Sequence, residues 1–451
     1  MNIIPNRNRL FIASCLALVV TSLTFALRAK IEFVFGADYG LTKEEVGRAF
    51  GPAFWGFTLA MFIGGLVLDL VKTRTVIWLA FVLHLIGLVT LILARDYTML
   101  FLANVFIGLG NGSVEAACNP LVATLYPDQK TRMLNRFHVW FPGGIVIGGL
   151  LAYILMDQLD LSWQLLTGLL FIPLALYGFL FFGQKIPETE RVTSGVSYKD
   201  MLRNVSAPYT IIATVLLMIL IAAGWINVDL SSNFTIIAIG VIIVLVVIEG
   251  KMINKMNLLL PFMVFCMFLT AATELGTNQW INALLERSGI NPMIILVVIT
   301  GLMAVGRFFA GPLVHRLNPT GVLLGSAIIS MLGLYALSYS EGAVMTMGAA
   351  IIFAIGVCYF WPTMLGFVAE YVPDSGALGL AIMGGAGMVA TSLVLPIMGE
   401  SIDTAGPQLT LRYMTILPAI LVVLFIGLVI YIRNKKPTHG ESADEQEQVP
   451  H

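Results

Sequence analysis

Charged side chains are scarce in this chain. Only 11% of its 451 residues are Asp, Glu, Lys or Arg, whereas soluble domains carry about 25%. Hydrophobic residues make up 58%, and the mean hydropathy is +0.90. This composition excludes a large soluble protein and predicts a chain that crosses a membrane many times. The net charge of −1 gives no sign of nucleic-acid binding.

Cysteine is also rare, and familiar enzyme motifs are missing. The cysteines lie in apolar runs without metal-ligand or disulfide spacing, which favours buried packing: Cys15, Cys118, Cys266 and Cys358. We find no H-E-x-x-H motif, no G-x-S-x-G motif and no cysteine–histidine cluster. The glycine-rich stretches at 143–149 and 384–387 lack the lysine of a phosphate-binding loop and favour close helix contacts. We therefore expect no enzyme, no metal site and no cofactor.

Long apolar runs dominate the sequence. Six of them precede a polar linker: 10–35, 46–70, 76–94, 99–126, 135–156 and 163–183. Eight follow it: 208–226, 234–250, 258–285, 292–314, 320–340, 343–371, 376–402 and 412–432. A hydrocarbon layer of ~30 Å needs roughly 20 helical residues. We predict an all-α membrane protein with 14 transmembrane helices.

The runs group into two bundles. We expect a six-helix bundle in 1–183, a linker with two inserted helices in 184–257, a second six-helix bundle in 258–434 and a disordered tail in 435–451. An internal repeat supports this division. The pattern Gly65-x-x-x-Asp69 recurs as Gly311-x-x-x-His315, and the stretches Gly110–Asp128 and Gly356–Asp374 are equally long.

Basic residues mark one side of the membrane. If the N-terminus is inside, the outer loops hold only Lys43, Arg48, Arg95, Arg287 and Arg412, and most other basic residues fall in inner loops. The positive-inside rule then places both termini in the cytoplasm, and we expect a multi-pass protein of the cell (inner) membrane. If only one helix of the inserted pair crossed, the basic C-terminal cluster would lie outside. We therefore predict that both cross.

Two six-helix halves with a glycine–acid–basic loop after the second helix resemble the major facilitator superfamily, a known case of repeated halves. A closer resemblance, to the fucose–galactose–glucose:proton symporter family, is carried by short motifs in matching order: GLGNGSVEAACNP at 108–120, Arg132-x-x-Asn135, Gly306-Arg307-Phe308, Pro362-Thr363 and the glycine-rich stretch 384–406. The resemblance implies a secondary active transporter that imports a neutral monosaccharide by alternating access, coupled to protons. It gives Glu115 a role in sugar recognition and coupling.

Two helices depart from the family pattern. The family carries an aspartate in its first helix that is implicated in proton coupling, whereas this chain reads FALRAKIEF there, with Arg28 and no aspartate. The fifth helix has His138 and Phe141 where the family has amide side chains. The coupling ion and the sugar are therefore open. The alternatives are a sodium-coupled transporter, an uncoupled facilitator, or an exporter of another small polar solute.

Glu115 is the first candidate for the substrate site. A carboxylate inside an apolar helix is costly in lipid unless it has a partner, a proton or a water-filled cavity. Asn111 and Asn119 lie four residues away on the same helix face. We expect Arg28 to pair with Glu115 across the cavity, with a local pair to Glu32 as the alternative. Such a cross-cavity pair would keep the carboxylate charged and favour a uniporter or another coupling ion.

A second candidate cluster lies in the run 258–285. Glu274 and Asn278 share a helix face, with Gln279 and Trp280 adjacent. Acids and amides that bind hydroxyl groups, beside an aromatic ring, suit a carbohydrate site. For Trp280 the alternative is an interfacial anchor.

Trp361 and His138 complete the expected substrate site. Trp361 is interpreted as a stacking platform or a packing residue, and His138 as a proton relay or a structural group. We assign ion coupling to Glu115, Arg28 and Glu274.

Six charged residues are expected to gate the cytoplasmic side rather than bind substrate: Asp69, Lys72, Arg74, Arg132, Arg307 and Arg316. The few charges of the predicted cavity are paired, which favours a neutral solute over an anion. The expected partners are a small-molecule substrate, a coupling cation and the lipid bilayer, with no nucleic acid. We expect a monomer.

Overall fold

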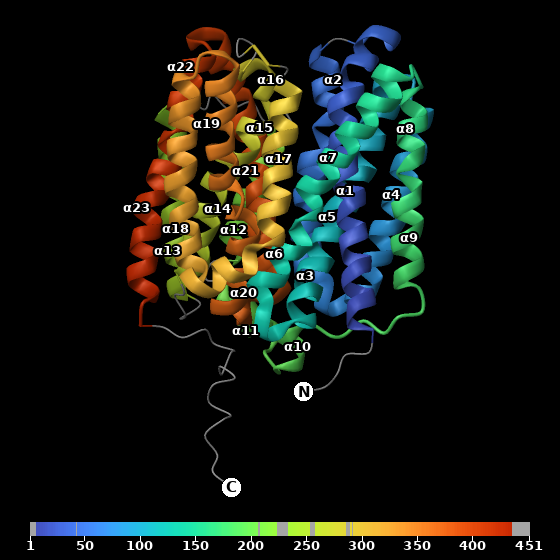
Figure 1. The fold of residues 1–451 in the computed structure, drawn as a ribbon. Helices are drawn as coiled ribbons and strands as arrows, with labels where there is room; N and C mark the ends of the chain where they lie inside the picture. Colours follow the sequence, from blue (N-terminus) through green and yellow to red (C-terminus); the bar gives the residue numbers. More distant parts are fainter. Residues whose placement is uncertain are drawn as a thin grey trace.

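The structure, a computed structural model, describes residues 6–41, 43–205, 208–222, 233–252, 258–285, 289–290 and 292–434. Within these ranges every regular element is a helix, and the helices form two bundles that stand side by side (Figure 1). The chain enters α1 (Arg7–Tyr39) and leaves α23 (Ile416–Ile432) at the same end of the molecule. We call this end the terminal face and the other end the opposite face.

The first bundle is built from the first six apolar runs. After α1 come α2 (Lys43–Phe50) with α3 (Pro52–Val71), α4 (Thr73–Leu93), α5 (Tyr97–Leu125), α6 (Lys130–His138) with α7 (Trp140–Ala152), and α8 (Trp163–Leu169) with α9 (Phe171–Phe181). Polar residues start two of these helices. The Asp96 side chain accepts a hydrogen bond from the Met99 amide (2.9 Å) at the start of α5, and Ser162 caps α8 in the same way.

Within the described residues, four helices connect the bundles: α10 (Glu190–Thr193), α11 (Tyr198–Asn204), α12 (Pro208–Ala222) and α13 (Asn233–Met252). The short helices α10 and α11 lie in the polar linker, where the sequence predicted no helix. α12 packs against α13 and also against one helix of each bundle, α3 and α21 (Gly376–Ala405).

The second bundle begins with α14 (Leu259–Ala271), a π-helical turn (Ala272–Gly276), α15 (Thr277–Gln279) and α16 (Ile281–Leu284). It continues with α17 (Pro292–Phe308), α18 (Ala310–Tyr339), α19 (Gly342–Val357) with α20 (Phe360–Tyr371), α21, and α22 (Pro407–Met414) with α23. α18 breaks at Asn318 (φ 57°) because the residue before a proline avoids helical geometry. The predicted repeat is visible, since α5 and α20 lead into matching 3₁₀ turns at Pro127–Gln129 and Pro373–Ser375.

Eleven helices of the described residues are long and apolar enough to cross a membrane, or twelve if Tyr198–Asn204 and Pro208–Ile221, bent by 68°, form one span. A shorter apolar helix covers Ile294–Phe308. The predicted number of fourteen therefore stays a prediction. Residues 223–232 and 253–257, which flank α13, and the tail 435–451 with its predicted disorder lie outside the described ranges.

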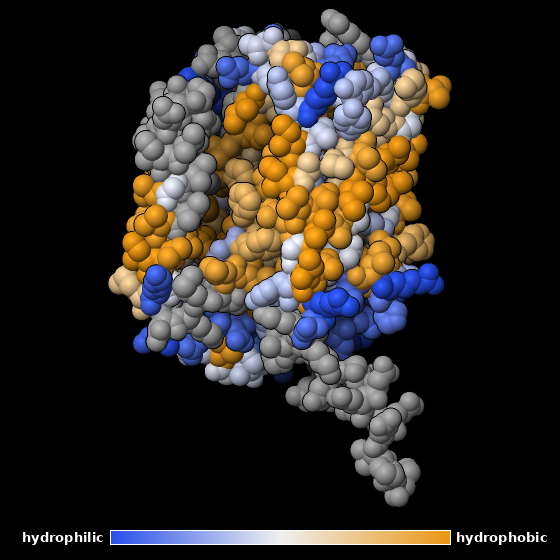
Figure 2. Space-filling view, turned by 90° about the vertical axis from the view of Figure 1, so that its left-hand side faces the viewer, coloured by the Kyte–Doolittle hydropathy of each residue, from blue (hydrophilic) through white to orange (hydrophobic). Residues whose placement is uncertain are grey.

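The outer surface of the bundles matches a bilayer. Figure 2 shows a broad band of hydrophobic side chains between two ends that carry hydrophilic ones. Large apolar side chains such as Phe179 (70% exposed) and Val423 (69%) lie on the outside. A continuous apolar surface of this extent would be costly in water and is favourable in lipid. The chain is a multi-pass membrane protein.

The two bundles touch closely toward the terminal face, where α6 packs on α20 and α3 packs on α21. The Thr131 hydroxyl in α6 donates to Glu370 Oε1 in α20 at 2.5 Å, and the Thr131 amide donates to the same oxygen at 3.1 Å. Gly366 has no room for a Cβ against Thr131, so the two helices lie backbone to backbone there. The gap between the bundles is therefore closed at this end.

Candidate functional site

A cavity lies between the bundles, from mid-height toward the opposite face. Its empty volume is about 850 Å³, which includes space open to the outside, and is within the range of small-molecule sites. The first bundle contributes apolar side chains, among them Phe25, Phe54 and Phe141. The second bundle contributes the polar groups: Glu274, Asn278, Gln279, Thr300 and Thr391. The structure thus brings three predicted residues, Glu274, Asn278 and Gln279, into one cavity.

Arg307 is buried beside the cavity, with 2% of its surface exposed, and is not among the described residues that line it. Its Nη2 donates to Glu274 Oε1 at 3.1 Å. Its Nε donates to the Cys358 carbonyl at 2.6 Å and its Nη1 to the His138 carbonyl at 3.2 Å. The structure therefore corrects the prediction that Arg307 belongs to a cytoplasmic latch. The side chain turns inward because one acid and two carbonyls replace its hydration there.

Glu115, Asn119 and His138 of the first bundle form a buried hydrogen-bonded chain, and none of them is among the described residues that line the cavity. Asn119 Nδ2 donates to Glu115 Oε2 at 2.6 Å, and Asn119 Oδ1 lies 3.0 Å from His138 Nε2. With this amide orientation, His138 Nε2 is the donor to Asn119. Glu115 Oε2 lies 3.8 Å from the same nitrogen.

Arg307 connects Glu274 with the chain of the first bundle. Its Nη2 bonds to Glu274 and its Nη1 to the carbonyl of His138, whose Nε2 lies 3.8 Å from Glu115 Oε2. With Glu115 and Glu274 ionised, Arg307 charged and His138 neutral, these four side chains together carry one excess negative charge. Burying a net charge is costly. One proton, or one other cation, would make the cluster neutral.

Arg28 does not form the predicted pair with Glu115. Its guanidinium lies over two rings, 4.3 Å from the Phe54 centroid and 4.6 Å from the Phe25 centroid. Arg28 lies 21 residues from the start of α1, and Glu115 lies 10 residues from the end of α5. At 1.5 Å per residue the two sites differ in height by roughly 16 Å, which is beyond the reach of a side chain. The alternative partner, Glu32, has a side chain outside the described set.

Asn111 also departs from its predicted place. Its Nδ2 donates to Thr24 Oγ1 at 3.0 Å, and its Oδ1 lies 2.9 Å from His84 Nε2. His84 Nδ1 in turn lies 3.3 Å from the Tyr177 hydroxyl. Four residues turn a helix by about 400°, so each step from Asn119 back to Asn111 drifts by about 40°. Asn111 therefore belongs to a structural network inside the first bundle.

Both candidate tryptophans pack against α21. Trp280 Nε1 donates to the Leu395 carbonyl at 2.9 Å, and its ring lies against Gly399. The Trp361 ring lies against Gly384 and Gly387. Neither is among the described residues that line the cavity, so the stacking role expected of them is not supported.

At the terminal face the linker is tied to both bundles by five residues that we call the linker latch: Asp69, Lys130, Thr189, Glu190 and Arg191. Thr189 donates to Asp69 Oδ1 at 2.6 Å, and Arg191 forms an ion pair with Asp69. Lys130 forms an ion pair with Glu190 at 2.7 Å and donates to the Ala369 carbonyl of α20 at 3.2 Å. The linker thus contacts the first bundle through Asp69 and reaches the second through Lys130.

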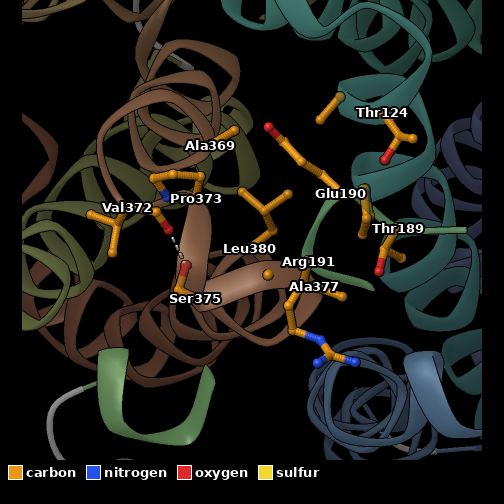
Figure 3. Close-up of a pocket in the computed structure, with 13 residues that line it drawn as sticks. Thr124, Thr189, Glu190, Arg191, Ala369, Val372, Pro373, Ser375, Ala377 and Leu380 are labelled. Atoms are coloured by element: carbon orange, nitrogen blue, oxygen red, sulfur yellow. Dashed lines mark hydrogen bonds between the residues drawn. The ribbon is translucent and has the colours of Figure 1, made fainter. Parts of the chain in front are cut away.

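The linker latch borders a pocket at the terminal face. Figure 3 shows Glu190 and Arg191 beside Ala377 and Leu380 of α21, with the Arg191 side chain pointing toward the first bundle. The pocket has an empty volume of about 360 Å³.

The other predicted gating residues lie at the same face. Arg132 donates to Gln129 at 3.1 Å and packs against Gly311 of α18. Lys72, Arg74 and Arg316 are exposed.

Sequence reasoning did not assign a site role to Lys130, Thr131, Glu190, Arg191 or Glu370. Glu370 carried the same signal as Glu115, an acid inside an apolar run, and could have been found by it. The linker residues carried no such signal, because charges in a polar segment are usually solvated.

Comparison with known sequences identifies the family. The family model of the Major Facilitator Superfamily matches residues 10–281 and 281–450. Facilitated glucose transporter member 10 of solute carrier family 2 from Xenopus tropicalis is 28% identical over 138 residues, which cover 30% of this chain and 25% of that protein. The chain thus matches only a quarter of that relative's length.

Solved structures share the fold over nearly the whole chain. The Escherichia coli fucose:proton symporter has a TM-score of 0.67 at 15% identity, covering 95% of this chain and 99% of that one. A proton:xylose symporter bound to 6-bromo-6-deoxy-D-glucose has a TM-score of 0.68 at 14% identity, covering 98% of both. A human organic anion transporter has a TM-score of 0.66 at 13% identity, covering 93% and 100%. Because the family model covers both bundles and the fold agrees, the chain belongs to the major facilitator superfamily and is a membrane transporter, not an enzyme.

Proposed function

We propose that the protein is a secondary transporter that imports a neutral monosaccharide by alternating access. The observation that carries this proposal is the cavity between the bundles, where amide, carboxylate and hydroxyl groups can bind sugar hydroxyls. No Lys or Arg is among its described lining residues, which disfavours an anion. Relatives named as transporters of fucose, xylose and glucose support a sugar.

We place the terminal face in the cytoplasm, in keeping with the Lys and Arg residues that the sequence gathers there. The bundles are closed at that face, and the cavity extends toward the opposite one. This arrangement corresponds to a state that takes substrate from outside. Import then requires the linker latch and the α6–α20 contact to open while the outer ends of the bundles close.

We further propose that one proton couples to transport through the buried cluster of Glu115, His138, Glu274 and Arg307. The bond from Arg307 to the His138 carbonyl joins the two bundles, so it must break or change when the bundles rock. Protonation removes the excess charge of the cluster. It therefore changes the free-energy difference between the two conformations, as coupling requires. Sodium coupling and uncoupled diffusion are the alternatives.

The test is uptake of labelled monosaccharides into proteoliposomes, with and without an imposed proton or sodium gradient. We expect proton-driven accumulation of at least one sugar by the wild type, and loss of that accumulation in Glu115→Gln. Glu341→Gln changes an exposed acid and is the matched control. Equilibrating uptake that ignores both gradients would contradict coupling but not sugar transport. No uptake of any sugar would contradict the carbohydrate assignment.

A further inference from the structure

The two walls of the central cavity differ in chemistry. Among the described lining residues, those of the first bundle are all apolar, and the main ones are Phe25, Phe54, Phe141 and Ile145. The polar side chains all come from the second bundle. A bound solute therefore meets carbon on one side and hydrogen-bonding groups on the other.

The apolar wall is held in place by ring contacts. The Phe25 centroid lies 5.8 Å from that of Phe54, at an interplanar angle of 83°, and 5.4 Å from that of Phe141, at 66°. Arg28 covers Phe25 and Phe54, with its guanidinium carbon within 4.6 Å of both centroids. Edge-to-face contacts and a cation over the rings fix their orientation. The wall thus offers a preformed apolar surface to a ligand.

The polar wall offers several acceptors. Asn278 Oδ1 is buried and has no hydrogen-bond partner, although buried polar atoms are normally paired. The hydroxyl groups of Thr300 and Thr391 donate to carbonyls of their own helices, at 2.8 and 3.0 Å, so their lone pairs are left for a ligand. Glu274 adds a carboxylate. Such a wall fits the O–H donors of a sugar.

We propose that the preferred ligands of this cavity are neutral glycosides with an apolar aglycone. The sugar hydroxyls donate to the second bundle, and the aglycone lies on the phenylalanine wall. This inference rests on the proposed function, because it uses the same cavity. A free sugar has hydroxyls around its whole ring, and those facing the phenylalanines lose water without gaining a hydrogen bond. An apolar aglycone on that side instead buries apolar surface.

The test is calorimetric binding to the protein in lipid nanodiscs, because sugar-headed detergents are themselves alkyl glycosides. The probes are glucose, xylose and fucose, each paired with its phenyl glycoside, and heats from empty nanodiscs are subtracted. We expect at least one phenyl glycoside to bind about tenfold more tightly than its free sugar. Phe141→Ala should remove most of this ratio. Asn278→Ala should weaken both members of the pair by a similar factor and leave the ratio unchanged.

Phe179→Ala, which removes a lipid-facing ring, is the matched control and should change neither affinity. A melting curve checks that each variant folds, and Phe141→Leu replaces Phe141→Ala if the latter does not. Equal affinities within every pair, or a ratio unaffected by the Phe141 variants, would overturn this inference and leave sugar transport standing. Binding of neither sugars nor glycosides would overturn both.

Discussion

Arg307 donates hydrogen bonds to three acceptors at once, two in the second bundle and one in the first. Glu274 and the Cys358 carbonyl come from the second bundle, whereas the His138 carbonyl comes from the first. A guanidinium donates from three separate nitrogens and so reaches acceptors that lie apart, whereas an ammonium group donates from a single nitrogen. The residue is therefore both a structural tie and the counter-charge of the acidic centre.

Removing this cation should destabilise the protein strongly. Arg307→Met leaves Glu274 buried without its partner, and breaking such a pair costs about 3–5 kcal/mol. We expect a clearly lower melting temperature in nanodiscs. The double variant Arg307→Met/Glu274→Met removes both charges and should recover most of the stability, but not transport. A single variant as stable as the wild type would show that Glu274 does not depend on Arg307.

Two glycines of α19 should respond oppositely to alanine. A Cβ at Gly356 would collide with the backbone of Ser330 in α18, so Gly356→Ala must force the helices apart, at a cost of about 1–3 kcal/mol. Gly348 has no atom within 4 Å of an added Cβ, so Gly348→Ala should stabilise the helix by about 0.5–1 kcal/mol. Melting temperatures of the two variants test this. Equal shifts in one direction would contradict the close α18–α19 contact.

At the scale of single residues, the sequence indicated which residue types are suited to a buried polar site. It did not indicate how high each residue lies along its helix relative to residues on other helices. An acid inside an apolar run drew attention to Glu115, and the four-residue spacing predicted that Asn119 lies beside it, where the two side chains form a hydrogen bond. The same spacing failed for Asn111, because two steps of four residues turn its side chain about 80° away from that of Asn119. Pairing Arg28 with Glu115 required the relative heights of two helices, which no local pattern contains.

Among the elements, the linker differs most from expectation. Apolar periodicity located the long helices because each must fill the membrane. The linker has little apolar surface, so its helices α10 and α11 are held by tertiary contacts that a sequence pattern does not reveal. The π-helical turn at Ala272–Gly276 is a second element that the sequence pattern did not predict. It carries Glu274, and such turns often re-aim side chains at functional sites.

The linker latch should keep the terminal face closed. Arg191→Gln removes its ion pair with Asp69, which should raise the population of the state open at that face. We would measure the labelling rate of Leu380→Cys, a pocket residue, by a membrane-impermeant thiol reagent applied to that face. The four native cysteines are buried and give a low background. We expect labelling several-fold faster in the Arg191→Gln background.

The control for this experiment is Arg203→Gln. Arg203 forms an exposed ion pair with Asp200 at 3.5 Å in the same linker, and such pairs contribute little. It should therefore leave the labelling rate unchanged. Equal rates in all three backgrounds would mean that the latch does not control access to the pocket.

For the whole molecule, the decisive question is whether the bundles move as bodies. Periodicity and the internal repeat predicted two halves, and the superfamily assignment agrees with them. The contacts between the halves were not predictable, because they depend on small residues whose partners lie far away in the sequence.

One contact between the halves offers a direct test. A Cβ at Gly143 in α7 would lie 3.9 Å from Ala304 Cβ in α17, within the roughly 3.5–4.5 Å of a disulfide.

The double variant Gly143→Cys/Ala304→Cys should therefore form a disulfide between the bundles on oxidation. Alternating access requires the bundles to rotate against each other, so the oxidised protein should lose uptake of its sugar in proteoliposomes and regain it on reduction. Each single variant, treated in the same way, controls for the oxidant and for the substitution. Binding should survive oxidation, because the cavity keeps its present shape. Full uptake by protein shown to be cross-linked would mean that α7 and α17 stay together throughout the cycle, and the moving contact would then have to be sought at α6 and α20.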